Sequence, residues 1–487
     1  MNAPIVRIYA LILLLLGSLV YFTSKWAVFD ADALEERTEN RRPLIAEQQI
    51  RRGSITTNDG VLVAESLPQG GGRNPVYVRR YPQGSLFGHP VGYSFVDVNR
   101  SEFELAENDL LVGEENEFAS IVDQLRGITQ EGADVTLTID ADAQRVATQG
   151  LESAAASSGV PNIGGGLVAI EPDTGAVRAM ASAPGFDPNT IEDEGEYKRL
   201  NRVQSAPLFN RPTQGVYPPG STMKVVTAAA ALDSGEIDPD TVINADSPKE
   251  IGGVDLENAG GEPFGDISAT DALTNSVNTY WAQVGERLGN DTYFEYMERF
   301  GFLSDPELDY PADAMAPSGV YEEGRLLDAD AGIDIGRVAI GQERLLTSPL
   351  QMAEVAATVA NGGALMQPTL LQEAKDPDGR TIEELDPDEQ ERVIDEETAA
   401  QLTEMMTRVT QEGTASNLTV EGVEFAGKTG TAEINIEDGI NQPWFIGFAP
   451  AQDPQIAVAA TIERCTGCFG GEVAGPIATQ VMEALLR

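Results

Sequence analysis

The sequence predicts a layered α/β domain, preceded by a smaller mixed α+β domain and by an apolar helix near the N-terminus. A strand–turn–strand pattern occupies residues 166–182, and three more strand candidates follow at 422–434, 443–448 and 455–462. The chain between these two groups of strands is mainly helical in pattern. The strands thus come from the two ends of this segment, and the helices come from its centre. This order indicates one sheet that is covered by helices.

The apolar helix is expected at residues 8–24, a run without a charged side chain. Such a run is at the short end of a membrane span, which takes about 17–25 residues. Lys25 and Trp26 suit the membrane–water interface. We therefore predict an uncleaved signal anchor. One alternative is a signal peptide cleaved near Ala31 and Ala33, although this site lies far beyond the apolar run. The other alternative is a buried core helix.

The smaller domain is expected to contain a β-hairpin at residues 54–64, because Asn58-Asp59-Gly60 lies between β-branched runs. Residues 134–140 alternate as a strand does, and 141–156 form a helix pattern that leads into the larger domain. Residues 93–111 are acidic and irregular. The predicted organisation is a cytoplasmic tail at 1–7, a signal anchor at 8–26, an N-terminal domain at 27–150 and a larger domain at 151–487.

In the larger domain, helix formers at residues 222–232 are followed by a stop signal at Gly235. Residues 347–361 form an apolar helix pattern, and 472–486 an amphipathic one. The acidic segment at 380–392 is expected to be a solvated face or a loop.

Composition narrows the possible functions. The chain carries 78 acidic against 32 basic residues, a net charge of −46, and such a surface repels nucleic acid. The single histidine, His89, lies in the predicted N-terminal domain and Ser221 in the larger one, which argues against a Ser-His-Asp triad. With one histidine and two cysteines, a protein-only zinc site is not expected.

The two cysteines, Cys465 and Cys468, have a spacing that suits a redox motif, half of a metal site or a short disulfide. A second pair that would complete a zinc site is missing, and so is a thioredoxin-like context. For a domain outside the membrane, a structural disulfide is the predicted state.

The strongest candidate for chemistry is Ser221-Thr-Met-Lys224, directly after the turn signal Pro218-Pro219-Gly220. The helix formers that follow place Ser221 at a helix N-terminus and Lys224 one turn further, on the same face. This puts a nucleophile beside a candidate base. The helix dipole favours a developing anion there and helps to lower the pKa of a lysine. The alternative is that Ser221 only caps the helix and that Lys224 is a solvated charge.

Two further motifs follow in order. Ser276-Val277-Asn278 lies in a helical pattern at 271–288, and Lys428-Thr429-Gly430-Thr431 lies on a predicted strand. Each motif is weak alone, because polar pairs on helices and polar edge strands are common. A glycine at position 430 would let a ligand approach the backbone closely. Together the motifs read Ser-x-x-Lys, Ser-x-Asn and Lys-Thr-Gly, which is the pattern of penicillin-interacting serine acyltransferases.

On these motifs the chain resembles the class B penicillin-binding proteins, which are monofunctional peptidoglycan D,D-transpeptidases, and it looks closest to the actinobacterial penicillin-binding protein A type. The likeness extends over nearly the whole chain, from Arg52-Gly53 through Gly88–Tyr93 to Trp444–Phe448. It implies a serine β-lactamase-like fold, with an antiparallel sheet flanked by helices, an all-helical subdomain and a dimerisation or pedestal-like N-terminal domain. The chain lacks the Glu-x-x-Leu-Asn element of class A β-lactamases, so efficient β-lactam hydrolysis is not expected.

The resemblance implies a role for each motif residue. Ser221 attacks the penultimate D-Ala carbonyl of a stem peptide, and either Lys224 or another group takes its proton. Ser276 relays the proton to the leaving amine, while Asn278 holds Lys224 and the substrate amide. The oxyanion hole is formed by the backbone N–H groups of Ser221 and Thr431. The substrate-binding strand is Thr429, Gly430 and Thr431, which together with Lys428 receives the terminal carboxylate.

The implied partners are stem peptides as D-Ala-D-Ala donor and amine acceptor, β-lactams, and the cytoplasmic membrane, with the catalytic domain on the extracytoplasmic side. A lipid-II-polymerising glycosyltransferase and division or elongation proteins are further implied partners, whereas no metal or organic cofactor is. One alternative function is a D,D-carboxypeptidase, which uses water as acceptor. The other is a β-lactam sensor or a non-catalytic cell-wall or division scaffold that retains penicillin binding.

The acid excess, together with only six lysines, leads to the hypothesis that the surface is adapted to salt. Like charges repel one another, and salt screens this repulsion. The free energy of unfolding is therefore expected to be larger in molar salt than in dilute buffer, as measured by urea denaturation under both conditions. Equal values would instead favour an acidic surface that serves solubility alone.

Overall fold

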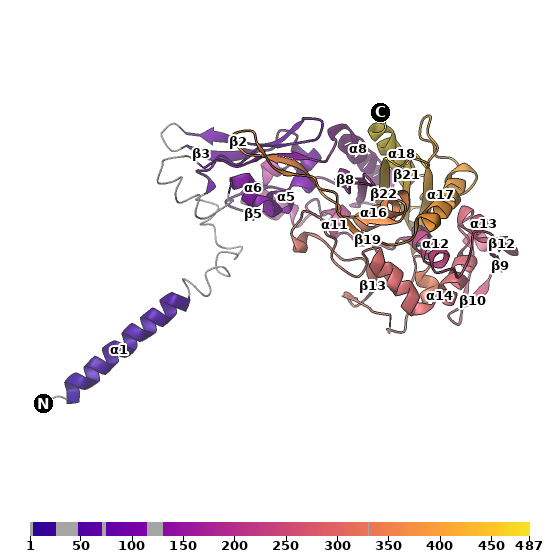
Figure 1. Ribbon diagram of the computed structural model, residues 1–487, viewed down its shortest axis with the longest axis horizontal. Helices are drawn as coiled ribbons and strands as arrows, with labels where there is room; N and C mark the ends of the chain where they lie inside the picture. The colour runs from indigo at the N-terminus through magenta and orange to yellow at the C-terminus, as the bar shows by residue number, and fades with distance from the viewer. Residues whose placement is uncertain (1–2, 26–46, 71–74, 114–129, 330) are drawn as a thin grey trace.

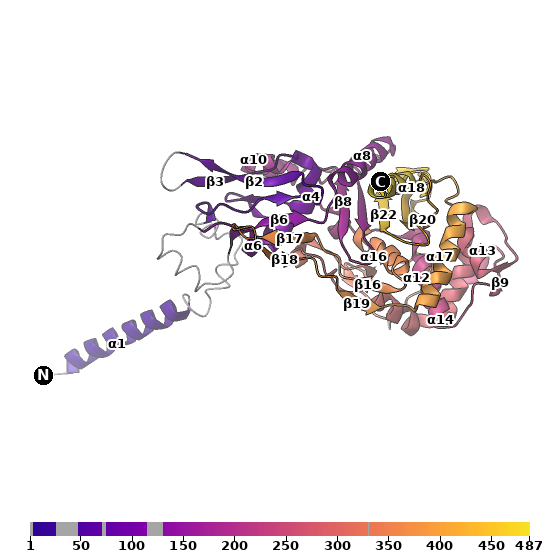
Figure 2. The ribbon, with the colours of Figure 1, turned by 45° about the horizontal axis from the view of Figure 1, so that its top comes forward.

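The computed structural model describes residues 3–25, 47–70, 75–113, 130–329 and 331–487. A lone N-terminal helix, a smaller sheet domain and a larger α/β domain follow one another along the long axis of the molecule (Figures 1 and 2). The helix, α1 (Ala3–Ser24), extends away from the rest of the chain. Its segment Ile5–Ser24 is the one helix in the described part of the chain that is long and apolar enough to cross a membrane. Residue 26, the predicted end of the anchor, and the alternative cleavage site lie outside the described residues.

The larger domain is built on the predicted antiparallel sheet. Its strand order is β20 (Ala426–Asn435), β21 (Ile440–Ala449), β22 (Ile456–Ile462), β7 (Gly165–Ile170) and β8 (Val177–Ala183), with the short β23 (Cys465–Thr466) paired to β21. The first and last parts of the domain therefore meet in one sheet, which confirms the predicted fold class.

Helices cover both faces of this sheet. A Cβ atom at Gly165 would meet Leu151 of α8 (Ala141–Ser157), whereas one at the next residue, Gly166, would meet Pro349 of α16 (Pro349–Ala360). Successive residues of a strand point to opposite faces, so α8 and α16 lie on opposite sides. Helix α18 (Ala474–Leu485) packs beside α8, as Figure 2 shows. Helix α8 spans the domain boundary predicted at residue 150, and that boundary stays a prediction.

A mostly helical part lies beside the sheet and contains the centre of the domain. Helix α12 (Lys224–Asp233) is buried along its whole length up to Leu232, and it contacts α14 (Asn278–Arg299) and α17 (Glu396–Gln411). A helix that is buried on every side belongs to the core of a large domain. The run of small alanines in α12 lets these neighbours approach closely.

Short elements in other parts of the two domains were not foreseen. The small sheets pair β9 (Val242–Asn244) with β12 (Asp266–Ser268), β10 (Lys249–Ile251) with β11 (Val254–Leu256), β13 (Gly319–Glu322) with β14 (Arg325–Leu326) and β15 (Leu345–Leu346), and β16 (Ala364–Met366) with β19 (Glu389–Arg392). The short helices are α4 (Gly88–Val91), α9 (Pro188–Ile191), α10 (Glu194–Leu200), α11 (Arg211–Gln214), α13 (Ala269–Thr274), α15 (Ile335–Val338), η2 (Gly84–Phe87), η4 (Ala259–Gly261) and η5 (Ala312–Ala314).

The smaller domain contains a second sheet, to which the C-terminal half of the chain contributes. Its order is β18 (Thr381–Glu384), β17 (Leu371–Lys375), β6 (Asp134–Leu137), β1 (Ile55–Thr56), β2 (Leu62–Gln69) and β3 (Val76–Arg80). The predicted hairpin is present as β1 and β2. The acidic segment 380–392 is mostly exposed, as expected, but it forms strands β18 and β19 rather than a loop.

Residues 93–111 form regular structure, so the prediction of an irregular segment is wrong. They contain β4 (Ser94–Phe95), β5 (Asn99–Arg100), α5 (Glu102–Ala106) and α6 (Asn108–Val112). Burial of Phe103 and Leu111 holds the two short helices in place. A low density of apolar residues hid this packing in the sequence.

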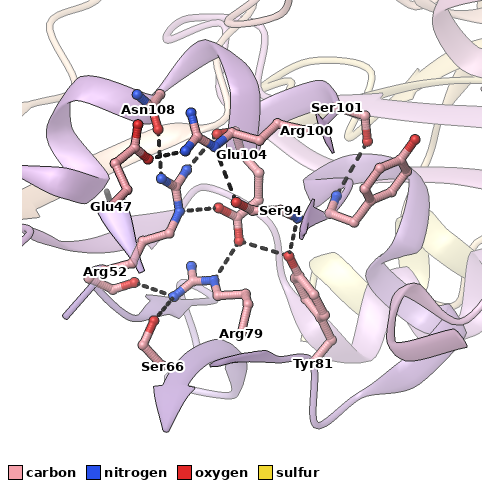
Figure 3. Close-up of polar contacts among 12 residues, drawn as sticks. Glu47, Arg52, Ser66, Arg79, Tyr81, Ser94, Arg100, Ser101, Glu104 and Asn108 are labelled. Atoms are coloured by element: carbon pink, nitrogen blue, oxygen red, sulfur yellow. Dashed lines mark hydrogen bonds and ion pairs between the residues drawn. The ribbon is translucent and has the colours of Figure 1, made fainter. Parts of the chain in front are cut away.

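Helix α5 also supplies the polar centre of the smaller domain, which Figure 3 shows. The fully buried carboxylate of Glu104 accepts hydrogen bonds from Arg52 Nε and Arg79 Nε, both at 2.6 Å, and from the Tyr81 hydroxyl at 3.1 Å. Burial alone would raise the pKa of Glu104, but the charges of Arg79 and Arg52 outweigh it and lower the pKa to about 2.

Glu104→Ala is expected to destabilise the protein by about 3–5 kcal/mol, because it leaves two buried guanidinium groups without their partner. Urea denaturation of the full chain in detergent measures this change. The matched control is Glu192→Ala, since the exposed Arg80–Glu192 pair is worth about 1 kcal/mol or less. A loss no greater than that of the control would contradict the assigned role of Glu104.

The same carboxylate should make stability depend on pH. Its pKa is about 2 in the folded state against 4.5 ordinarily, so its contribution is complete above pH 4.5 and is lost as the pH falls toward 2. In Glu104→Ala this part of the acid-induced loss should be absent.

Candidate active site

Ser221 lies where a short 3-10 helix, η3 (Gly220–Met223), runs directly into α12. Gly220 has a positive φ of 54°, and a Cβ atom there would come within 2.9 Å of the Thr431 backbone. The glycine thus lets η3 pack against strand β20. Ser221 lines an open cleft of about 930 Å³, together with Ser276, Thr429 and Thr431.

Ser276 joins two buried lysines at the floor of this cleft. Lys224 Nζ donates to the Ser276 carbonyl at 2.7 Å and also lies 3.3 Å from the Ser276 hydroxyl. Its third partner is Asn278 Oδ1, at 2.7 Å. Lys428 Nζ donates to the same Ser276 hydroxyl at 2.9 Å and to the Thr429 carbonyl at 2.8 Å. The structure therefore brings the three predicted motifs into one network.

The segment expected as one helix at 271–288 is broken at Ser276. This residue lies between α13 and α14 with a φ of 58°, in the left-handed region. The break turns both its carbonyl and its hydroxyl toward the lysines. Strained backbone of this kind is typical of functional sites.

Burial of the two ammonium groups lowers both pKa values. Lys224 and Lys428 are fully buried, and no carboxylate in the described part of the chain forms an ion pair with either. Burial, followed by the charge of Lys428, holds the pKa of Lys224 well below its usual range. Burial lowers the pKa of Lys428 to about 7. At neutral pH the pair can thus hold fewer than two protons, so one amine is available as a base.

The Ser221 hydroxyl itself forms no hydrogen bond with the described residues. The predicted contact with Lys224 is therefore not made here, because Ser276 and Asn278 occupy the ammonium group. In substrate-free enzymes such contacts are often long and shorten only in the complex.

Two threonines of strand β20 face the cleft, whereas Gly430 of the same strand packs against the segment that leads into η3. Thr429 Oγ1 lies 2.6 Å from Thr414 Oγ1, and Thr431 Oγ1 accepts from Gly470 N at 3.2 Å. A Cβ atom at Gly430 would lie 2.7 Å from the Pro219 carbonyl. The glycine at 430 is thus needed for the docking of η3, and the reason expected from the sequence, ligand approach, is wrong.

Two of the predicted features lie outside the lysine network. Cys465 and Cys468 are joined in a disulfide beside the loop that carries Phe469 and Gly470, which line the cleft. His89 is buried against the Pro207 carbonyl, and burial, aided by Arg211, lowers its pKa to about 3. A histidine that stays neutral and is absent from the cleft lining cannot serve Ser221. In the described part of the chain, no cluster of histidine, cysteine or acidic side chains could hold a metal ion.

Sequence reasoning missed several residues that line the cleft. Thr414 is the hydroxyl partner of Thr429, but its place depends on the fold and has no local signal. Gln342 also lines the cleft and had been given no role. The other residues without an earlier role include Arg337, Asn417 and Phe469.

The penicillin-interacting serine acyltransferases have a serine at the start of a helix, with buried amines in place of a histidine as the candidate base. The site described here has these features. Comparison with known families agrees. The penicillin binding protein transpeptidase domain matches residues 165–483, and the penicillin binding protein A dimerisation domain matches residues 52–135. The chain belongs to the penicillin-binding protein transpeptidase family, as its motifs had indicated.

Two curated relatives match the whole chain, and two solved structures match about nine tenths of it. The peptidoglycan D,D-transpeptidase PbpA of Mycolicibacterium smegmatis is 34% identical, over 100% of this chain and 99% of the relative. PbpA of Mycobacterium tuberculosis is 33% identical with the same coverage. The crystal structure of PBPA from M. tuberculosis has a TM-score of 0.79 at 31% identity, over 90% of this chain and 100% of that one. Its ceftriaxone acyl-enzyme complex has a TM-score of 0.81 at 32% identity, over 91% and 100%.

Lys428→Ala is expected to raise the pKa of Lys224, because it removes the neighbouring charge that helps to lower it. The chain has only six lysines, so selective 13C labelling of lysine lets NMR follow each amine as the pH is changed. Lys249→Ala, which removes a lysine outside the cleft, is the control. If the pKa of Lys224 is the same in both variants, the two buried amines are not coupled.

Proposed function

We propose that the protein is a peptidoglycan D,D-transpeptidase, which cross-links stem peptides through an acyl-enzyme at Ser221 and is acylated by β-lactams. The observation that carries this proposal is the Ser276 hydroxyl, held between Lys224 and Lys428 at the floor of the Ser221 cleft. It is supported by relatives named peptidoglycan D,D-transpeptidase and by a β-lactam acyl-enzyme complex among the similar structures.

In the acylation step, the neutral amine of Lys224 takes the proton of the Ser221 hydroxyl. Ser221 Oγ then attacks the carbonyl carbon of the penultimate D-Ala, and the backbone N–H groups of Ser221 and Thr431 stabilise the oxyanion. Collapse of this intermediate breaks the peptide C–N bond. The Ser276 hydroxyl, within reach of both lysines, delivers the proton to the departing D-Ala amine.

The strand that carries Lys428 orients the donor peptide. The hydroxyls of Thr429 and Thr431 face the cleft, with the Lys428 charge behind them, so they can receive the terminal carboxylate. Asn278 Oδ1 fixes Lys224, and its Nδ2 donates one hydrogen bond to the Glu257 carbonyl at 3.1 Å. The second N–H of Nδ2 is left for the substrate amide.

In the second half of the reaction, an amine of a neighbouring stem peptide attacks the Ser221 ester. The new amide bond forms, and the amine proton returns through the lysines to Ser221 Oγ. With water in place of the amine, the same site would act as a D,D-carboxypeptidase. The chemistry of the motifs is common to both reactions.

We further propose that α1 anchors the protein in the cytoplasmic membrane, with residues 1–7 inside and the catalytic domain outside. In this arrangement residues 8–26 span the membrane, 27–150 form an N-terminal domain and 151–487 the transpeptidase domain. The proposed protein partners are a lipid-II-polymerising glycosyltransferase and division or elongation proteins.

The intact mass of the protein after incubation with benzylpenicillin tests the acyl-enzyme. One adduct is expected, and it should be absent in Ser221→Ala. In Lys224→Ala the rate of acylation should fall about a hundredfold or more, as loss of a general base does. Ser304→Ala, outside the cleft, is the control. Lack of an adduct in the parent protein, at low and at molar salt, would overturn the proposal in favour of a scaffold.

Release of D-Ala from a stem pentapeptide, with and without an acceptor amine, separates the two enzymatic alternatives. A transpeptidase forms the cross-linked product when the amine is present. Release of D-Ala without any cross-linked product would assign the protein as a carboxypeptidase.

A further inference from the structure

A second cavity, of about 320 Å³, lies between the smaller and the larger domain and shares no lining residue with the Ser221 cleft. Tyr93, Ser101 and Glu102 line it from the smaller domain. The larger domain contributes Phe186, Tyr197 and further residues of the segment 200–214. The proposed reaction uses none of these residues.

Glu102 is the unusual member of this lining. The residue is only 7% exposed, yet its Oε2 accepts no hydrogen bond and forms no ion pair in the described part of the chain. A buried polar atom without a partner is costly and requires an explanation. The backbone adds a second cost, because Glu102 has a φ of 47°, where glycine is favoured.

Glu104, two residues further along the same helix, is an internal comparison. Both carboxyl groups are buried, but Glu104 has two arginine partners and Glu102 has none. Accordingly, the pKa of Glu104 is lowered to about 2, whereas burial raises the pKa of Glu102 to about 7. The smaller domain thus supplies counter-charges to one glutamate, whereas the other, which lines the cavity, is without one in the described part of the chain.

Tyr93, Phe186 and Tyr197 line the cavity, and their rings pack edge to face in one cluster. The Tyr93 ring lies 6.2 Å from Phe186, at an interplanar angle of 81°, and 6.3 Å from Tyr197, at 71°. Proteins bind alkylammonium ions through the faces of aromatic rings, by cation–π attraction, and through the charge of a nearby carboxylate.

A metal ion fits this site less well. Metal ions that prefer oxygen take several such ligands, and no group of three candidate ligand side chains exists in the described part of the chain. The cavity offers one carboxylate, several rings and the neutral side chains of Ser101, Asn201 and Gln214. That set suits a cation whose charge is spread over methyl or methylene groups.

We propose that this interdomain cavity binds an alkylammonium group, with the Glu102 carboxylate as its counter-charge and the rings of Tyr93, Phe186 and Tyr197 around its carbon atoms. Because both domains line the cavity, the bound cation ties the smaller domain to the larger one. Either a free quaternary ammonium solute or the ammonium end of a peptide side chain supplies this chemistry.

Titration calorimetry of the full chain in detergent with tetramethylammonium chloride tests the proposal, with sodium chloride at equal concentration as the reference. Saturable binding of tetramethylammonium alone is expected. Glu102→Gln and Tyr197→Leu should each weaken it at least tenfold. Glu107→Gln, which changes a glutamate of the same segment outside the cavity lining, should leave it unchanged.

Equal affinity of the parent protein and Glu102→Gln for tetramethylammonium, or heats no different from those of sodium chloride, would overturn the proposal. The cavity would then hold water beside a protonated carboxyl group. The benzylpenicillin adduct of each variant shows independently that the protein is folded, so a failure here is distinct from a failure of the proposed enzymatic function.

A parallel titration with Nα-acetyl-lysine methylamide distinguishes the two sources of the cation. Tighter binding of tetramethylammonium would point to a free quaternary solute. Tighter binding of the lysine derivative would point to the primary ammonium group of a peptide.

Discussion

The structure of the site depends on one constraint: the ammonium groups of Lys224 and Lys428 are buried without a carboxylate partner in the described part of the chain. Removing an ammonium ion from water is expensive, and only closely placed hydrogen-bond acceptors reduce the cost. Here the acceptors are the Ser276 carbonyl and hydroxyl, Asn278 Oδ1 and the Thr429 carbonyl. They come from the α13–α14 break and from strand β20, so the lysines bind these segments to one another. The fully buried helix α12 provides the rigid base for Lys224.

Buried charge serves a different purpose in each domain. Around Glu104, opposite charges meet and each group stays ionised, which stabilises the fold but leaves no proton to exchange. At Ser276, two amines are buried without a counter-charge in the described part of the chain, and burial lowers both pKa values, that of Lys428 to about 7. The partner of a buried ion thus decides whether it supports structure or chemistry. On this rule Glu102, whose Oε2 is buried without a partner in the described part of the chain, is a carboxyl group at the domain interface that a ligand would complete.

The sequence allowed prediction of what is encoded locally. Alternating residues and turn signals predicted strands β7, β8 and β20–β22 and the β1–β2 hairpin, and the order of three short motifs predicted which side chains would meet. Pairing between distant segments has no local signal, so the addition of β17 and β18 to the sheet of the smaller domain was not foreseen. The same limit hid the Thr414–Thr429 contact. It also led to a wrong reason for Gly430, because the Pro219 carbonyl that approaches it is distant in sequence.

The acidic surface tends to raise the pKa of an amine, whereas burial in the lysine network lowers it. A net charge of −46 attracts protons and tends to raise the pKa of every amine in the molecule. At 0.1 M salt, this effect is screened at exposed sites over a distance of about 10 Å. The desolvation of a fully buried amine, in contrast, does not depend on salt. Burial therefore dominates at Lys224 and Lys428, and a surface this acidic is compatible with a base that works at neutral pH. Because both lysines are buried, their pKa values depend mainly on desolvation and only weakly on the charge of the surface.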